Sequence, residues 1–302
     1  MRQRPDGLLF GIAAYALWGI FPIYWPLLEP AGATELLAHR VVWSAVVMGV
    51  LALVLRRRAA MRAILRDRRV SLLLLGAAAV ISVNWGVYIW SVTNEHVVEG
   101  SLGYFINPLV TVCMGVLVFA ERLRPLQWTA VGIAAVAVLG LTLEYGRPPW
   151  VALTLAFSFG TYGLLRKKAN VGAIEGLTVE TFLILPAAVG YLVWLQADGS
   201  GHLLADPPWH QVLLFSAGLA TAVPLLCFGA AATRIPLTTI GLLQYIAPTL
   251  QFLLGITVGG EPMPATRWIG FAVIWVALAL FTYDSWRDWR TTRLRVEAST
   301  AQ

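Results

Sequence analysis

The chain carries little charge for its length. Asp, Glu, Lys and Arg make up 13% of its 302 residues, against the ~25% that is usual in soluble domains. Hydrophobic residues make up 58%, and the mean hydropathy is +0.72. The composition therefore disfavours a soluble globular domain and indicates a protein that lies mostly in lipid.

The sequence also lacks the short motifs of common catalytic sites. It has no G-x-x-x-x-G-K-[ST] phosphate loop, no G-x-S-x-G and no H-E-x-x-H. Its two cysteines, Cys113 and Cys227, fall inside apolar segments, and none of its four histidines pairs with another at i, i+4. We therefore expect no enzyme activity, no cofactor, no metal site and no structural disulfide.

What the sequence does contain is a series of apolar stretches, most of them near the ~20 residues needed to cross a ~30 Å hydrocarbon core. Because no water is available there to bond the backbone, each must be helical. The sequence thus predicts an all-α polytopic membrane protein with ten transmembrane helices. The stretches cover residues 8–28, 35–55, 70–91, 101–119, 127–144, 149–165, 178–195, 209–231, 236–257 and 266–285.

The second half of the chain repeats the first at an offset of 140 residues. Glu121 falls on Glu261, and the Phe-Ile-Asn-Pro run at 105–108 falls on the Tyr-Ile-Ala-Pro run at 245–248. Each copy holds five apolar segments, and because five is odd the second copy must enter the membrane from the opposite side. Inverted repeats of this kind are the architecture of many secondary transporters. The expected units are two inverted five-helix repeats, residues 1–145 and 146–285, and a cytoplasmic tail, residues 286–302.

The positive charges predict the orientation. With the N-terminus inside, nineteen of the 22 Lys and Arg residues lie on the inner side, only Arg147 and Arg267 lie outside, and Arg40 falls within a span. This bias predicts a bacterial-type cytoplasmic (inner) membrane protein with both termini in the cytoplasm. We interpret the basic run at 56–69 as a loop that meets anionic lipid, and not as a nucleic-acid patch.

The few polar side chains within the spans fall on helical faces, at spacings of i, i+3 or i+4, and i+7. Pro108 and Pro248 are equivalent in the repeat, and each frees a backbone carbonyl. A broken helix in each half indicates a substrate site near the midplane. The alternative is that these polar groups bond across helices as packing contacts. The side chains expected to line one central cavity are Asn84, Tyr88, Tyr104, Asn107, Gln244 and Gln251.

Arg40 is the one charge placed well inside a span. It lies five residues after Glu35, which is ~8 Å along a helix that rises 1.5 Å per residue. We expect it to face an external vestibule and attract a carboxylate, and outward snorkelling is the alternative. Trp85 lies deeper and is expected to wall the cavity for an apolar or aromatic substrate. His39 follows Glu35 by one helical turn, so the two are candidates for a pair.

Three stretches carry a family resemblance: ELLAHRVVWS at 35–44, SVNWGVYIWSVTNEHVVEGSLGYFINPL at 82–109 and GLLQYIAPTLQFLLG at 241–255. Together with the duplicated unit, they resemble the drug/metabolite transporter superfamily, specifically EamA-type ten-helix permeases of the RarD type. The resemblance covers about residues 7–285. It implies an inner-membrane permease with a central cavity between two halves. Members of the superfamily carry amino acids, metabolites or nucleotide sugars.

The expected function is therefore secondary-type transport of small organic molecules, such as metabolites, amino-acid-like compounds or drugs, by alternating access. A non-transporting membrane sensor or scaffold is the alternative, and it would not need a polar lining in both halves. The expected partners are a small-molecule substrate and membrane lipid, without nucleic acid. A G-x-x-x-G pair at Gly255 and Gly259 would permit close helix approach in a homodimer.

Overall fold

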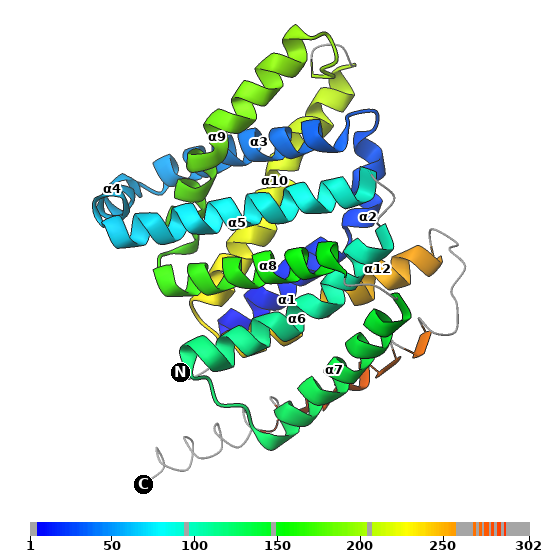
Figure 1. The fold of residues 1–302 in the computed structure, drawn as a ribbon. Coiled ribbons are helices and arrows are strands. Elements are labelled where there is room, and N and C mark those ends of the chain that lie inside the picture. Colours follow the sequence, from blue (N-terminus) through cyan, green and yellow to red (C-terminus); the bar gives the residue numbers. More distant parts are fainter. Residues whose placement is uncertain are drawn as a thin grey trace.

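The structure is a computed structural model that describes residues 5–93, 97–145, 149–203 and 207–257, with short stretches between 268 and 287. Every regular element in these ranges is helical, which confirms the expected all-α class for this part of the chain (Figure 1). The elements are α1 (Pro5–Gly19), α2 (Phe21–Tyr24), the 3₁₀ helix η1 (Trp25–Leu28), α3 (Ala33–Val54), α4 (Arg58–Arg66), α5 (Arg68–Thr93), α6 (Val97–Phe119), α7 (Pro125–Tyr145), α8 (Trp150–Ala169), α9 (Ala173–Ala197), α10 (Pro208–Ala232), α11 (Leu237–Leu243) and α12 (Ile246–Thr257).

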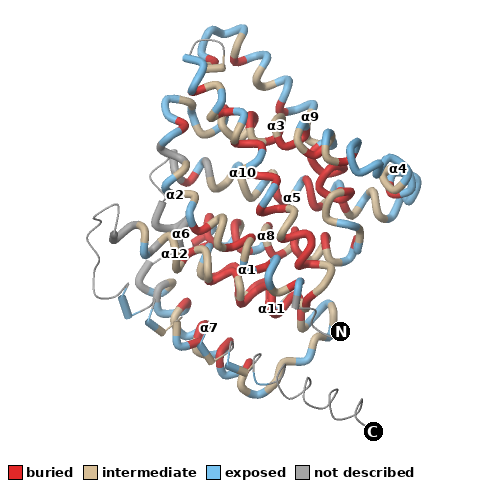
Figure 2. Tube along the Cα trace, turned by 180° about the vertical axis from the view of Figure 1, so that it is seen from behind, coloured by how far each residue is buried: buried red, intermediate tan, exposed pale blue. Residues whose placement is uncertain are grey.

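Several of these helices are suited to a membrane. Helices α3, α9 and α10 and residues Arg68–Tyr88 of α5 are long and apolar enough to cross one. Large apolar side chains also cover outer surfaces of the bundle, for example Leu117 on α6 and Leu143 on α7, which are 82% and 72% exposed. Figure 2 shows the buried residues gathered toward the middle of the bundle. The chain is a multi-pass membrane protein.

The helix starts follow the 140-residue offset. Three helices of the second half each begin 140 residues after a helix of the first half. The pairs are α3 and α9, at Ala33 and Ala173; α5 and α10, at Arg68 and Pro208; and α6 and α11, at Val97 and Leu237.

The helix contacts come in matching sets. The contact between α5 and α8 corresponds to the contact between α10 and α1. In the same way, the contact between α3 and α10 corresponds to the contact between α9 and α5. Likewise α6 packs against α8 as α12 packs against α1. Helices α3 and α9 also pack against each other, as do α6 and α11. Exchanging the two halves therefore maps each set of contacts onto another.

The two prolines that the sequence places equivalently have different effects. Helix α6 runs without a break from Val97 to Phe119 although it contains Pro108, so the break predicted there is wrong. Helix α6 packs against α8 and α11, and the backbone of Pro108 and Val112 lies against Gly241 of α11. In the second half the break is present, because α11 ends at Leu243 and α12 begins at Ile246, two residues before Pro248.

Two further elements differ from the predicted spans. The first span, expected over 8–28, is one continuous helix only as far as Gly19. The rest of the span forms two short helices, α2 and η1. The basic run contains a helix of its own, α4, which places Ile64 against Leu74 and Val179. The Asp67 side chain then caps α5 by accepting the backbone N–H groups of residues 69 and 70 at 2.9 and 3.1 Å.

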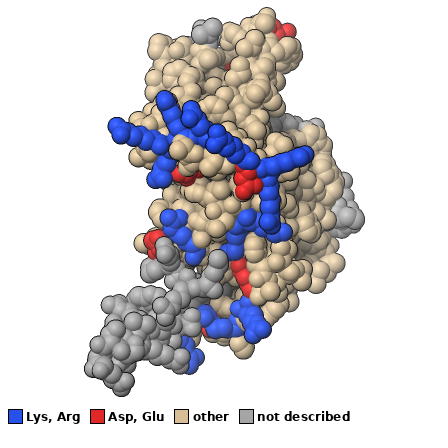
Figure 3. All heavy atoms as spheres, turned by 90° about the vertical axis from the view of Figure 1, so that its left-hand side faces the viewer, with Lys and Arg blue, Asp and Glu red and all other residues tan. Residues whose placement is uncertain are grey.

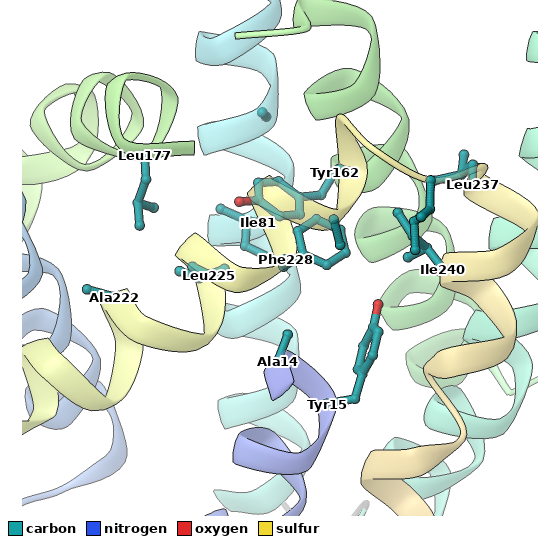
Figure 4. Packing of buried hydrophobic residues seen from close by; sticks show 14 of the residues in the cluster. Ala14, Tyr15, Ile81, Tyr162, Leu177, Ala222, Leu225, Phe228, Leu237 and Ile240 are labelled. Carbon is teal, nitrogen blue, oxygen red and sulfur yellow. The ribbon is translucent and has the colours of Figure 1, made fainter. Parts of the chain in front are cut away.

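The core is built around aromatic side chains from three helices. Tyr162 of α8 stacks on Phe228 of α10, with ring centroids 5.5 Å apart, and Tyr15 of α1 meets the same Phe228 edge-on at 6.5 Å. Figure 4 shows these rings between α1, α8 and α10, with Ile240 of α11 beside them. Offset and edge contacts of this kind add about 0.5–1.5 kcal/mol per pair to the gain from burial. These ring contacts hold α1, α8 and α10 together.

Candidate functional site

Arg40 lies within a group of aromatic side chains. Its Nε donates a hydrogen bond to Thr221 Oγ1 of α10 at 2.8 Å, and its guanidinium lies 5.0 Å from the centroid of the Trp85 ring. The rings of Tyr88 and Tyr104 are 5.9 Å apart, and both hydroxyls are within electrostatic reach of the guanidinium. The structure thus brings together four of the sequence-predicted side chains, from α3, α5 and α6.

This arginine–aromatic cluster remains partly accessible. Tyr104 is 36% exposed, and Arg40 and Trp85 are half-buried. A guanidinium beside aromatic faces and hydroxyl groups can bind a carboxylate and pack an apolar body at the same time. The cluster therefore suits a small organic molecule that carries a negative charge on an apolar frame.

A second polar group lies further along α6. The Thr111 hydroxyl accepts a hydrogen bond from Gln244 Nε2 at 3.1 Å and lies 3.5 Å from Asn107 Oδ1. These three side chains are buried, with 8% exposure at Asn107, 1% at Thr111 and 4% at Gln244. Gln244 follows the last residue of α11, where the helix is interrupted. The two spans with equivalent prolines therefore meet through their polar side chains, which we call the amide cluster.

Helix α6 connects the two clusters. Tyr104, Asn107 and Thr111 succeed one another along one face, over ~10 Å at 1.5 Å per residue. Exposure falls along this face from 36% at Tyr104 to 1% at Thr111. We call this series of polar side chains, from the partly exposed arginine–aromatic cluster to the buried amide cluster, the polar path.

Two predicted residues make hydrogen bonds elsewhere. Asn84 Nδ2 donates to the Leu155 carbonyl and to Ser158 Oγ, both at 2.9 Å, and so ties α5 to α8. Gln251 Nε2 donates to the Trp18 carbonyl at 3.1 Å and ties α12 to α1. These are the interhelical bonds that the packing interpretation expects.

At the N-terminal end of α3, Glu35 is bonded to a distant segment. Its carboxylate accepts the backbone N–H of His202 at 2.8 Å and lies 2.7 Å from His202 Nδ1. The candidate partner His39 is also near, with Nε2 at 3.8 Å from Oε1. No local pattern in the sequence indicates His202, which belongs to the α9–α10 connection.

Glu121 follows the end of α6 that is further from the arginine–aromatic cluster, and it connects the two halves of the chain. Its carboxylate accepts the backbone N–H groups of Leu237 and Thr238, the first residues of α11, at 2.8 and 2.9 Å. Lys167 Nζ of α8 lies 3.4 Å from the same carboxylate and donates to the Ile235 carbonyl at 2.7 Å. A carboxylate at a helix N-terminus satisfies backbone donors that would otherwise be unpaired. This end of α6 is therefore held against α8 and α11.

One buried ion pair is not predictable from the local sequence. Arg166, which the charge pattern places on the inner side, lies buried in α8, with NH1 3.1 Å from Glu180 Oε1 of α9. The sequence does not distinguish Arg166 from its neighbours Lys167 and Lys168, so its burial could not be predicted. Other predicted features, including Gly259, Glu261, Arg147, Arg267 and the tail after 287, lie outside the described residues.

The chain is similar to known membrane proteins over nearly its whole length. The profile of the EamA-like transporter family matches residues 6–143 and again residues 148–283. The chain is 55% identical over 297 residues to Protein RarD of Streptomyces exfoliatus, which covers 98% of this chain and 94% of that protein. It is 46% identical over 284 residues to an uncharacterized transporter of Vibrio cholerae, covering 94% of each.

A solved crystal structure shares the fold. It aligns with a TM-score of 0.68 at 20% sequence identity and covers 92% of this chain and 97% of that one. At this level of identity the likeness concerns the arrangement of the helices.

Proposed function

Because the chain belongs to the EamA-like transporter family and is RarD-like, as its sequence motifs indicated, we propose that it transports small organic molecules across the bacterial inner membrane. The observation that carries this proposal is the polar path along α6, which joins the arginine–aromatic cluster to the amide cluster. A buried amide costs about 2–7 kcal/mol without a hydrogen-bonding partner. Helices that were only a scaffold would not need such groups in both halves.

The proposed path combines six of the eight side chains predicted from the sequence. Arg40, Trp85, Tyr88 and Tyr104 would receive the substrate, and Asn107 and Gln244 would contact it further in. Asn84 and Gln251 would hold the neighbouring helices in place on either side. An aromatic or aliphatic carboxylate, such as an amino acid or a related metabolite, suits this combination of groups.

We further propose that the two halves, residues 1–145 and 146–285, form inverted repeats that rock against each other. The support is the common offset of the helix starts and the matching helix contacts. In this conformation Glu121 and Lys167 tie the end of α6, beyond the amide cluster, to α8 and α11. Alternating access would require this contact to open when the outer cluster closes.

The function can be tested with inverted membrane vesicles. Vesicles that contain the chain should take up or release at least one member of a panel of labelled amino acids and carboxylate metabolites, at a rate above vesicles without it. The fold alone allows a sensor or scaffold, and such a protein would give no difference for any panel member.

Arg40 is expected to set the preference for charged substrates. Arg40→Ala should raise the KM for anionic or zwitterionic compounds by about 10- to 100-fold, because a hydrogen bond to a charged group contributes about 1.5–3 kcal/mol. Neutral compounds should be affected much less. The Arg40→Lys variant retains the charge and should recover part of the affinity, and an equal loss for neutral and anionic compounds would contradict this role.

The proposed orientation places both termini in the cytoplasm. Figure 3 shows Lys and Arg side chains spread across one face, and the exposed ones include Arg58, Arg62 and Arg68 around α4. In a variant without Cys113 and Cys227, a cysteine at Asp198 should react with an impermeant thiol reagent on intact cells.

A cysteine at Glu95, which lies outside the described residues, should react in the same way, whereas one at Asp67 should react only after the cells are broken. The reverse pattern would invert the topology.

A further inference from the structure

The ion pair between Arg166 and Glu180 lies in the interior of the second half. Arg166 NH1 contacts Glu180 Oε1 at 3.1 Å, and the Tyr162 hydroxyl donates to Glu180 Oε2 at 3.2 Å. All three side chains are among the most buried of the described residues, at 3% exposure or less. The Nε of Arg166 is buried without a hydrogen-bonding partner. An ionisable pair inside a membrane bundle is costly and commonly marks an ion or proton pathway.

Two glycines make room for the guanidinium. A Cβ atom on Gly176 of α9 or on Gly229 of α10 would collide with the Arg166 guanidinium. The Arg166 side chain therefore extends from α8 between the backbones of α9 and α10. The position of these three helices depends on the ion pair between Arg166 and Glu180.

The position of Glu180 matches that of Arg40 in the other half. Residue 180 is 140 residues after residue 40, and each lies seven residues after the first residue of its helix, Ala33 in α3 and Ala173 in α9. Under the inverted arrangement the two side chains lie at similar depths from opposite faces of the membrane. One half thus carries a cation and the other carries an acid at equivalent positions of the repeat.

We propose that Glu180 binds the proton that is coupled to transport. This inference rests on the proposed function and names its coupling ion. A proton from water adds to a carboxylate oxygen of Glu180 and converts it to a neutral acid, so that the pair changes from net zero to one positive charge. Arginine stays protonated in proteins. The uncompensated guanidinium then destabilises the packing of α8 against α9 and α10, and this favours the alternative conformation of the half.

Few other titratable groups act on this site. Among the described residues, Arg166 and Tyr162 of α8 are the charged or titratable side chains that interact with Glu180, and α3, α5 and α10 contribute none. Glu175, closer to the start of α9, pairs instead with Arg57 at 3.3 Å. Proton binding at this site therefore depends on Glu180 alone, with Arg166 as the fixed charge and Tyr162 as the positioning hydroxyl.

The test uses purified full-length protein in proteoliposomes and the compound that the vesicle panel selects. Glu180→Gln should still exchange labelled for unlabelled compound faster than protein-free liposomes do, because exchange needs no net proton movement. The net accumulation driven by an imposed pH gradient should fall at least tenfold. Glu175→Gln, on the same helix, should retain pH-driven accumulation.

The outcomes separate this inference from the proposed function. Full pH-driven accumulation by Glu180→Gln would overturn the inference. So would wild-type protein that exchanges the compound but does not respond to a pH gradient, although the transporter assignment would stand. Absence of exchange by the wild type would overturn the proposed function itself.

If Glu180→Gln does not fold, a milder variant tests whether Glu180 binds the coupled proton. Tyr162→Phe removes one donor from the carboxylate, so the midpoint of the pH dependence of accumulation should move to higher pH while exchange continues. An unchanged midpoint would overturn the inference.

Discussion

Asn107→Leu and Gln244→Leu are each expected to reduce transport strongly while the protein inserts at near-normal levels. The two amides meet at the Thr111 hydroxyl, at the deep end of the polar path. Each leucine removes a group that would contact the substrate, and a lost hydrogen bond in a buried site costs about 1–3 kcal/mol. This corresponds to a reduction in rate of roughly 10- to 100-fold. Initial uptake rates in vesicles, normalised to the amount of inserted protein, measure the effect.

Thr142→Val serves as the control for the loss of a polar group within the bundle. The Thr142 hydroxyl bonds to the Val138 carbonyl within its own helix at 2.8 Å, so its removal should leave transport unchanged. Wild-type rates in both leucine variants would show that the amide cluster only packs α6 against α11.

Gly218→Ala is expected to disrupt the contact between α3 and α10. A Cβ atom at position 218 would lie 2.5 Å from Trp43 Cβ and 2.7 Å from the Trp43 carbonyl oxygen, and the Ser44 hydroxyl bonds to the Gly218 carbonyl at 3.1 Å. Backbone atoms cannot move aside as a flexible side chain can. Overpacking costs about 1–3 kcal/mol or more, which is enough to lower the amount of folded protein several-fold.

The matched control is Gly132→Ala in α7, where an added Cβ would meet no atom within 4 Å. The yield of monodisperse protein in mild detergent, measured by size-exclusion chromatography, should fall for Gly218→Ala and stay at the wild-type level for Gly132→Ala. Equal yields would show that α3 and α10 can separate without loss of the fold.

Much of the helical arrangement could be predicted from the sequence, because lipid allows few alternatives. Apolar stretches of membrane-spanning length must form helices. Their predicted boundaries agree to within two residues with α3, α5 and α10, whereas α9 begins five residues before its predicted span. The amphipathic helix α4 was missed. Its run of arginines dominates the local composition, and the burial of Ile64 depends on Leu74 and Val179 from other helices.

The site was less predictable, since the partner of a polar side chain depends on contacts between distant segments. The helical spacing placed Tyr104 and Asn107 on one face of α6, but it could not tell that Asn84 bonds to α8. The buried position of Arg166 was hidden for the same reason, because its partner Glu180 lies on the next helix and the space for its guanidinium is left by two glycines on other helices, Gly176 and Gly229. The continuity of α6 at Pro108 likewise depends on packing by α8 and α11.

The most direct test of the account is exchange transport by the purified chain in proteoliposomes, using the compound that the vesicle panel selects. We predict rapid exchange of internal for external labelled compound by the wild-type protein, and exchange that is at least about tenfold slower for Asn107→Leu or Gln244→Leu. Exchange by the wild type that is no faster than in protein-free liposomes, or equal exchange by the wild type and both variants, would contradict a substrate path along α6.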